Sequence, residues 1–168
     1  MNGETIMKEA YFAGGCFWCI TPVFAELAGV GGVTAGYSGG EESNPSYEQV
    51  KSQSTLHRET IRIDYDETQV SYPALLHLFL QNVDPFDGGG QYIDRGRSYT
   101  LAVYYQEESE RLCAERMTEE LEAAAGKPVY VALEKFVAFY DAEEYHQNYY
   151  LKNPEAFAEE IESSGRKR

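Results

Sequence analysis

The sequence predicts an α/β (α+β) fold, a two-layer sandwich in which helices cover a mixed, mainly antiparallel sheet with a ferredoxin-like core. Segments that favour strands and segments that favour helices alternate along the chain, which is typical of two packed layers. Residues 60–65 alternate between apolar and polar side chains, as in a strand with one covered face. A doubly wound parallel sheet, the second interpretation, requires strands that are more uniformly apolar.

The first half of the chain contains three predicted strands and one helix. In chain order there is a strand at 9–13, a helix at 17–27, a strand at 33–37, a loop at 41–45 and a strand at 60–65. Gly14 and Gly15 end the first strand, and Pro22 indicates an irregular early turn of the helix because it lacks a backbone N–H. The third strand has an apolar face formed by Ile61, Ile63 and Tyr65.

The second half contains two predicted helices, two strand regions and a final helical region. There is a helix after residue 71, a loop at 84–97, a strand at 99–105, a helix at 107–125, a strand-rich stretch at 129–139 and a helical region from 141. Ser71 is suited to cap a helix start, and Gly126 is typical of a helix end. Asp141 and Glu144 match a capping box. The long helix is expected to bury a stripe of Cys113, Met117, Leu121 and Ala124.

The length of 168 residues fits a single domain, with a core at 8–155 and a polar C-terminal tail at 156–168. The chain has 14 Lys and Arg against 28 Asp and Glu, and its net charge of −14 disfavours nucleic acids and anionic membranes as partners because both would repel it. No apolar run approaches the ~20 residues of a membrane helix, and the N-terminus lacks the apolar stretch of a signal peptide. We therefore expect a cytoplasmic protein.

The sequence GGCFWC at 14–19 is the feature with the most chemical content, because a predicted strand gives way there to a predicted helix. Cys16 would lie at the helix start, where unpaired amide groups and the helix dipole stabilise a thiolate. We therefore expect a Cys16 pKa below that of an ordinary thiol. A buried structural cysteine is the competing interpretation, since free cysteine is among the most buried residue types. The strand–Gly-Gly–Cys–helix context favours a nucleophile.

Cys16 and Cys19 form a C-x-x-C pair with three interpretations. A thioredoxin-like dithiol is one, although Phe and Trp stand between the cysteines where such motifs usually carry Pro or Gly. Half of a zinc site is another, but the chain has no second C-x-x-C and its three histidines show no ligand spacing, so we expect no metal. The third is a nucleophile with an incidental neighbour.

Seven motifs occur in a fixed order along residues 8–155. They are AGGCFWC (13–19), GYSGG (36–40), NPSYEQV (44–50), HRETIRI (57–63), NVDPFD (82–87), DRGRSYT (94–100) and YHQNYYL (145–151). With these motifs the sequence resembles the A-type peptide-methionine sulfoxide reductases. The resemblance implies an enzyme that reduces the S-epimer of methionine sulfoxide, free or in proteins, to methionine and thereby repairs oxidised proteins.

The resemblance also implies residue roles. Cys16 corresponds to the nucleophile, which becomes a sulfenic acid, and Glu59 to the acid that protonates the sulfoxide oxygen. Tyr47 and Tyr99 correspond to hydrogen-bond donors to that oxygen. The implied substrate-binding residues are Phe17 and Trp18 around the methyl group and Asp94 at the substrate backbone. These roles suit the chemistry, because a sulfoxide sulfur accepts a thiolate only when its oxygen is protonated or strongly hydrogen-bonded.

Each of these positions has a plainer interpretation when the resemblance is set aside. Tyr47 and Tyr99 are two of 14 tyrosines and would be packing residues, Glu59 an exposed charge at a strand start, and Asp94 a turn residue. Burial of Glu59 beside Phe and Trp side chains is expected to raise its pKa and keep it protonated near neutral pH.

A sulfenic acid on Cys16 must be reduced again. Some members of the family carry resolving cysteines in a C-terminal segment, but residues 144–168 contain none here. We expect reduction by an external thiol, namely thioredoxin, glutaredoxin or glutathione, with Cys19 as the next candidate. Cys113 qualifies only if the fold brings it within disulfide reach. The expected partners are oxidised proteins or free methionine sulfoxide and a thiol-reductant protein, with no bound cofactor.

Two alternative functions use the same cysteines. A C-x-x-C dithiol-disulfide oxidoreductase would need both Cys16 and Cys19 and would reduce disulfides. A peroxide-sensing domain would form a Cys16 sulfenate without turning over sulfoxide. A sulfoxide assay combined with thiol titration separates the three functions.

Overall fold

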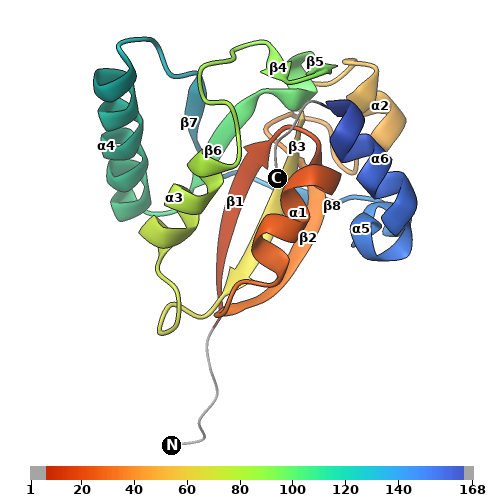
Figure 1. The fold of residues 1–168 in the computed structure, drawn as a ribbon, viewed down its shortest axis with the longest axis horizontal. Coiled ribbons are helices and arrows are strands. Elements are labelled where there is room, and N and C mark those ends of the chain that lie inside the picture. Colours follow the sequence, from red (N-terminus) through yellow and green to blue (C-terminus); the bar gives the residue numbers. More distant parts are fainter. Residues whose placement is uncertain (1–6, 165–168) are drawn as a thin grey trace, which may run out of the picture.

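Six strands form one sheet in the order β7-β6-β1-β3-β2-β8 in the computed structural model, which describes residues 7–164 (Figure 1). These strands are β1 (Lys8–Gly14), β2 (Val30–Ser38), β3 (Arg58–Tyr65), β6 (Leu101–Tyr105), β7 (Val131–Lys135) and β8 (Phe139–Asp141). The short strands β4 (Gly90–Gln91) and β5 (Asp94–Arg95) pair separately as a small hairpin.

The α-helices of the described residues are α1 (Phe17–Ala25), α2 (Tyr47–Lys51), α3 (Tyr72–Gln81), α4 (Glu108–Ala125), α5 (Tyr149–Lys152) and α6 (Pro154–Ser164). Two short 3₁₀ helices, η1 (Arg97–Tyr99) and η2 (Glu144–His146), lie in the connections. The first part of the predicted tail therefore belongs to α6, and residues 165–168 lie outside the described residues.

The four central strands have a ferredoxin-like topology. The units β1-α1-β2 and β3-α3-β6 interlock, because β3 lies between β1 and β2 while β1 lies between β3 and β6. All of these neighbours pair antiparallel. At the edges, β7 follows α4 and pairs parallel with β6, whereas β8 pairs antiparallel with β2. The predicted mixed, mainly antiparallel sheet is confirmed.

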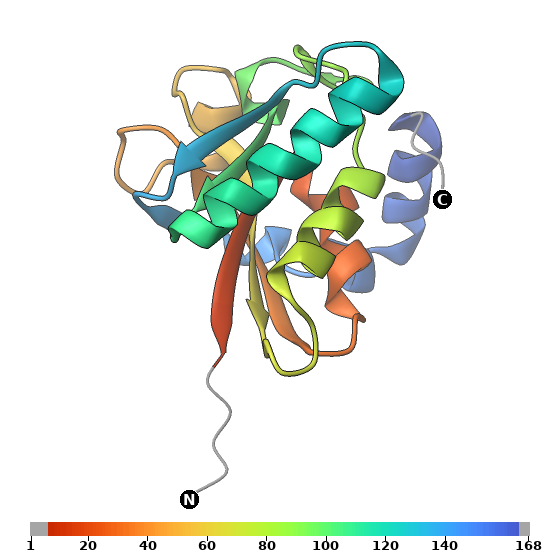
Figure 2. The same cartoon turned by 90° about the vertical axis from the view of Figure 1, so that its left-hand side faces the viewer.

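Strand alternation divides the core between the two faces of the sheet. Ala10 and Phe12 of β1 face the main core, to which α1, α3 and α4 contribute, and Figure 2 shows α4 running across the sheet beside α3. Tyr11 and Ala13 of the same strand belong to a second cluster on the opposite face. There the Tyr11 ring stacks on Phe136, with ring centroids 4.1 Å apart.

Helix boundaries follow local capping chemistry. The Ser71 hydroxyl accepts a hydrogen bond from the amide of Ala74 at 3.2 Å, which confirms the predicted N-cap of α3. Gly126 ends α4 with φ of +67°, as predicted for a left-handed cap. The helix α2 was not among the predicted elements, although Ser46 and Gln49 form a capping box at its start.

Three predictions about local structure are wrong. Asp141 does not cap a helix, because its backbone pairs with Gly36 as the last residue of β8. Ala124 is exposed, since the buried residues of α4 lie in its first two turns. Tyr99 does not begin a strand but ends η1, and β6 starts two residues later.

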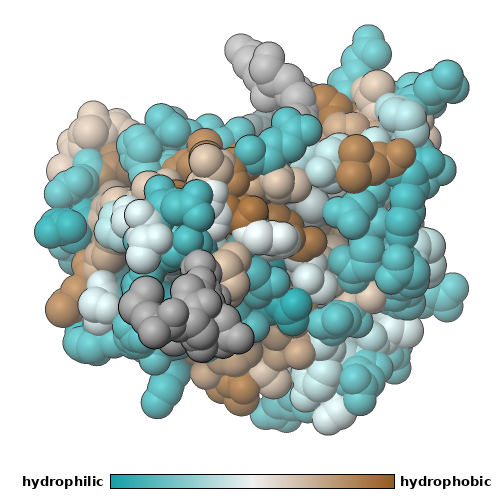
Figure 3. Space-filling model, turned by 90° about the horizontal axis from the view of Figure 1, so that it is seen from below, coloured by the Kyte–Doolittle hydropathy of each residue, from teal (hydrophilic) through white to brown (hydrophobic). Residues whose placement is uncertain are grey.

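The surface is largely polar, in line with the composition. The face seen from below in Figure 3 is mostly hydrophilic, with hydrophobic groups interspersed. None of the helices within residues 7–164 combines the length and the apolar character needed to cross a membrane.

Replacement of a leucine in the main core should destabilise the fold. Leu76 of α3 is fully buried, so Leu76→Ala is expected to lower the free energy of unfolding by about 2–5 kcal/mol. Leu112 of α4 is 53% exposed, and Leu112→Ala should change it by no more than about 0.5 kcal/mol. Urea unfolding of both variants measures the difference, and equal losses would contradict the placement of this core.

Candidate active site

A tight turn between β1 and α1 carries the candidate nucleophile. Gly15 has φ of +85°, a left-handed conformation that glycine adopts without steric cost. A Cβ atom on Gly14 would lie 2.9 Å from the Phe79 ring, so the close packing there also requires glycine. Cys16 follows as the N-cap residue of α1, and its carbonyl accepts the amide of Cys19 at 3.1 Å.

The Cys16 thiol has a pKa raised well above its ordinary value. A hydrogen bond with Cys19 is the largest cause, followed by burial and by the negative charges that Cys19, Glu59 and Asp94 would carry. The residue nevertheless remains partly exposed. The expected lowering of the pKa by the helix start is therefore wrong, because the hydrogen bond with Cys19, burial and the acidic neighbours outweigh the helix dipole. Cys16 rests as a neutral thiol.

Glu59 stands directly beside the start of α1. It belongs to β3, is 2% exposed, and its Oε1 accepts a hydrogen bond from the Phe17 amide at 3.1 Å. Burial raises its pKa to about 8, while the bond from Phe17 acts in the opposite direction. The carboxyl group is consequently protonated at neutral pH and can serve as a proton donor next to Cys16, as the sequence predicted.

Two tyrosines from different segments meet near this acid. Tyr47 is the first residue of α2, Tyr99 is the last residue of η1, and their hydroxyls share a hydrogen bond. Burial raises the pKa of both phenols, and the charge of Glu59 would raise it further. Both therefore stay neutral and retain a hydroxyl proton that can be donated to an oxygen atom.

Aromatic rings line the region beside the thiol. Trp18 is partly buried and stacks on Tyr149 of α5, with ring centroids 4.0 Å apart and an interplanar angle of 15°. Phe17 is buried, and its ring centroid lies 6.5 Å from that of Tyr47 and 5.1 Å from that of His146. The rings of Phe17 and Trp18 thus belong to one aromatic cluster that is drawn from both ends of the chain.

His146 was not assigned a role from the sequence, although it lies in the YHQNYYL motif. Its Nδ1 accepts a hydrogen bond from Trp18 Nε1 at 2.9 Å. Burial lowers its pKa to about 4, so the ring is neutral and carries its proton on Nε2. That nitrogen is buried and has no hydrogen-bond partner among the described residues. It is a polar group available to a ligand.

Two side chains attach the C-terminal segment to the site. Glu143 accepts hydrogen bonds from the Tyr37 hydroxyl at 2.8 Å and from the Tyr47 amide at 3.0 Å. Gln147 bonds both the amide and the carbonyl of Ala35 in β2. These contacts hold η2 and α5 against α2 and β2. Gln147 lies in the YHQNYYL motif, whereas no motif or periodicity marked Glu143 in the sequence.

Asp94 lies in β5 and acts electrostatically on the site. It is half-buried, and its charge acts on Glu59, Tyr99 and Cys16. The structure therefore brings together the residues that the resemblance indicated, from the start of α1, α2, β3 and the β5–η1 segment.

Cys113 is separate from this group. It lines a cavity of ≈ 250 Å³ together with Lys8 and Tyr65, which lie at the opposite ends of β1 and β3 from Gly14 and Glu59. Seven residues of β1 correspond to roughly 20 Å of strand, which excludes a disulfide with Cys16 in this fold. Burial also raises the Cys113 pKa, so its thiol is unreactive.

The arrangement combines a thiol with three neutral proton or hydrogen-bond donors and an aromatic cluster. Such a set can stabilise negative charge on an oxygen while sulfur attacks the atom bonded to it. Among residues 7–164 there is no group of three or more His, Cys, Asp and Glu side chains that could hold a metal ion.

Comparisons with known proteins agree with this chemistry. A family model for peptide methionine sulfoxide reductase matches residues 8–168. Peptide methionine sulfoxide reductase MsrA of Streptococcus equi subsp. equi is 44% identical over 155 residues, which cover 91% of this chain and 92% of that protein.

Two solved structures share the fold. Methionine sulfoxide reductase A of Corynebacterium diphtheriae is 28% identical with a TM-score of 0.81, and the match covers 92% of this chain and 78% of that one. The reduced form of Mxr1 from Saccharomyces cerevisiae is 27% identical with a TM-score of 0.83, covering 89% and 87%. Since the family match extends from β1 beyond the end of α6, the chain belongs to the family of peptide methionine sulfoxide reductases.

Proposed function

We propose that the protein reduces methionine-S-sulfoxide, free or in proteins, with Cys16 as the nucleophile and Glu59 as the acid. The observation that carries this assignment is the buried Glu59 carboxyl, hydrogen-bonded to the amide that directly follows Cys16 and with a pKa raised to about 8. This bond holds the Cys16 thiol and the Glu59 carboxyl next to each other in space. The reaction requires such an arrangement, because the thiol attacks the sulfoxide sulfur while the acid protonates the sulfoxide oxygen.

The reaction balances with these groups alone. Cys16 Sγ attacks the sulfoxide sulfur while Glu59 gives its proton to the sulfoxide oxygen. The oxygen then passes from the substrate sulfur to Sγ: an Sγ–O bond forms while the substrate S–O bond and the transient Sγ–S bond break. Methionine leaves, and Cys16 holds the oxygen as a sulfenic acid. Two electrons pass from the thiol to the sulfoxide sulfur, and the proton from the thiol replaces the one that Glu59 gave. Tyr47 and Tyr99 donate hydrogen bonds to the departing oxygen.

Epimer selection follows from the two unlike sides of the site. The aromatic rings of Phe17 and Trp18 favour the methyl group, whereas the hydroxyls of Tyr47 and Tyr99 favour the oxygen. At a chiral sulfur these two substituents cannot exchange places without moving the rest of the methionine. Asp94 and the His146 Nε2–H are positioned as an acceptor and a donor for the substrate backbone.

Recycling requires a second thiol. The thiols of Cys16 and Cys19 already share a hydrogen bond, so we infer that Cys19 attacks the sulfenic acid, releases water and forms a disulfide. An external thiol reductant then restores both thiols by disulfide exchange. A protein partner is compatible with the family, since Mxr1 from Saccharomyces cerevisiae also has a structure in complex with Trx2.

The same contacts disfavour the two alternatives. A dithiol oxidoreductase and a peroxide sensor both depend on a stabilised thiolate, whereas the Cys16 pKa is raised. We further propose one catalytic domain, supported by the single main sheet, and a cytoplasmic location, supported by three cysteines that are all free thiols.

The role of Cys16 can be tested by substitution. Cys16→Ser should abolish reduction of methionine-S-sulfoxide with dithiothreitol, because a hydroxyl cannot replace the thiol as a two-electron donor. Loss of each epimer is followed by chiral chromatography. Activity in Cys16→Ser, or consumption of the R epimer by the wild type, would refute the assignment.

The pH dependence tests Glu59. Wild-type turnover should fall as pH rises through about 8, where Glu59 loses its proton, and Glu59→Gln should lower turnover by about 10²–10⁴-fold and remove that descending limb. Folded Glu59 keeps its proton up to about pH 8, whereas in the unfolded chain it loses the proton above pH 4.5. As pH rises from about 4.5 to 8, the free energy of unfolding of the wild type should therefore fall relative to that of Glu59→Gln. A fully active Glu59→Gln would assign the acid elsewhere.

Mass spectrometry tests Cys19. After one equivalent of methionine sulfoxide, the wild type should lose ~2 Da by forming a disulfide, whereas Cys19→Ser should gain ~16 Da as a sulfenic acid. Cys113→Ser serves as the matched control and should behave as the wild type. A wild-type gain of ~16 Da that persists would show that an external thiol reduces the sulfenic acid directly.

A further inference from the structure

A solvent-open cavity lies beside the segment that carries Asp94 and Tyr99. Its volume is ≈ 620 Å³, within the size range of ligand sites, and it lies at the first residues of the parallel strands β6 and β7. The side chains of Arg58, Arg97, Thr100 and Tyr130 line it, together with Gly88 and Gly96. Among the residues that the structure describes, no Asp or Glu lines this cavity, although the chain has a net charge of −14. We call it the arginine cavity.

Arg58 contributes a buried guanidinium group to the arginine cavity. The residue is 4% exposed, and its Nε donates to Thr100 Oγ1 at 2.8 Å. One terminal nitrogen donates to the Tyr104 hydroxyl and to Glu134 Oε2, which lines a different cavity. The second terminal nitrogen has no hydrogen-bond partner within residues 7–164 and is not fully enclosed.

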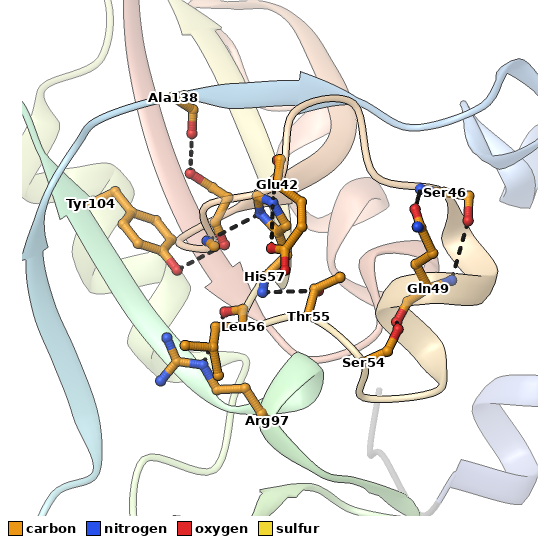
Figure 4. Close-up of polar contacts among 12 residues, drawn as sticks. Glu42, Ser46, Gln49, Ser54, Thr55, Leu56, His57, Arg97, Tyr104 and Ala138 are labelled. Atoms are coloured by element: carbon orange, nitrogen blue, oxygen red, sulfur yellow. Dashed lines mark hydrogen bonds and ion pairs between the residues drawn. The ribbon is translucent and has the colours of Figure 1, made fainter.

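Arg97 supplies the second positive charge of the cavity and, unlike Arg58, has no acidic partner in the described part of the chain. Its Nε donates to the Leu56 carbonyl at 3.1 Å, and Figure 4 shows the two terminal nitrogens pointing away from this bond. The ion pairs found among the described residues, such as those of Arg58 and Arg95, do not include Arg97. Two guanidinium groups in one cavity provide the planar donor geometry that carboxylates match.

The arginine cavity and the catalytic site share one wall. Arg58 and Glu59 are consecutive in β3, so their side chains point to opposite faces of the sheet. Gly96, Arg97 and Thr100 line the arginine cavity, whereas Asp94 and Tyr99 of the same segment belong to the catalytic site. A polypeptide that inserts a methionine sulfoxide beside Cys16 can therefore extend across this segment.

We propose that the arginine cavity binds an acidic side chain of a polypeptide substrate, at a short distance along the chain from its methionine sulfoxide; this rests on the function proposed above. The overall negative charge opposes the approach of such a substrate only weakly, because charges beyond about 8 Å are screened at physiological ionic strength. Near the cavity Arg97 supplies the positive charge that has no acidic partner within residues 7–164, whereas the charge of Arg58 is balanced by its ion pair with Glu134. The ligand class is a carboxylate, held by hydrogen bonds from Arg97 and the unpaired nitrogen of Arg58.

Paired peptide substrates test the proposal. Each peptide carries one methionine sulfoxide and either Glu or Gln at one position, scanned over about two to six residues on either side, or roughly 20 Å of extended chain. For at least one position the Glu peptide should have a KM about three- to tenfold lower than its Gln counterpart with an unchanged kcat, since it gains one partly exposed charged contact. Added salt should reduce the difference.

Three variants identify the source of the preference. Arg97→Gln should remove the Glu preference, and Arg97→Lys should retain part of it because the charge remains. Arg116→Gln, which removes an exposed charge on α4 outside the arginine cavity, should retain all of it. The proposal is overturned if no Glu position lowers KM, or if the preference survives in Arg97→Gln.

Free ligands separate the two remaining outcomes. Acetate and inorganic phosphate are titrated while backbone amide shifts of Gly88, Gly96 and Arg97 are followed by NMR. Inhibition of Glu peptides by acetate supports a carboxylate subsite, whereas binding of phosphate with no discrimination among peptides would assign the arginine cavity to a small free anion and refute the substrate role. Reduction of free methionine sulfoxide by all variants, measured in parallel, separates failure of this proposal from failure of the proposed function.

Discussion

The hydrogen bond between the Phe17 amide and Glu59 is the contact on which the site depends. It joins the first residue of α1 to β3 and thereby sets the position of Cys16 relative to the acid. Burial excludes water from this hydrogen bond and also raises the Glu59 pKa to about 8. The carboxyl that accepts the bond therefore still holds its proton at neutral pH. Position and protonation thus have one structural cause.

The same environment makes the Cys16 thiol a weaker nucleophile. Burial, Cys19 and the neighbouring acids raise the Cys16 pKa, so the resting thiol is a poor nucleophile. In the proposed mechanism Glu59, Tyr47 and Tyr99 compensate for this weak nucleophile, because each can donate to the sulfoxide oxygen and make the sulfoxide sulfur more electrophilic. Catalysis of this kind activates the substrate more than the enzyme. A neutral resting thiol is also protected from adventitious oxidation by peroxide.

The turns and helix ends around this site could be predicted from the sequence, but the contacts between residues distant in sequence could not. Two glycines before Cys16 indicated the turn into α1, and Ser71 and Gly126 indicated helix ends, because each depends on neighbours in the chain. The bond from Trp18 to His146 joins residues 128 positions apart, which no periodicity encodes. The predicted direction of the Cys16 pKa shift was wrong because the hydrogen bond with Cys19, burial, and the acids Glu59 and Asp94 together raise the pKa. The burial and the two acids come from elements distant in sequence, which the local motif did not indicate.

Strand alternation explains how a basic cavity and a protonated acid can occupy consecutive residues. Arg58 precedes Glu59, and a cation so close in sequence would be expected to lower the pKa of the acid and remove its proton. In β3 the two side chains leave on opposite faces, and the Arg58 charge is directed to Glu134 and Tyr104. Lys51, which is farther from Glu59 in sequence, lowers the Glu59 pKa, and this effect is smaller than the rise that burial causes. In the two proposals, one strand therefore serves proton transfer on one face and charge recognition on the other.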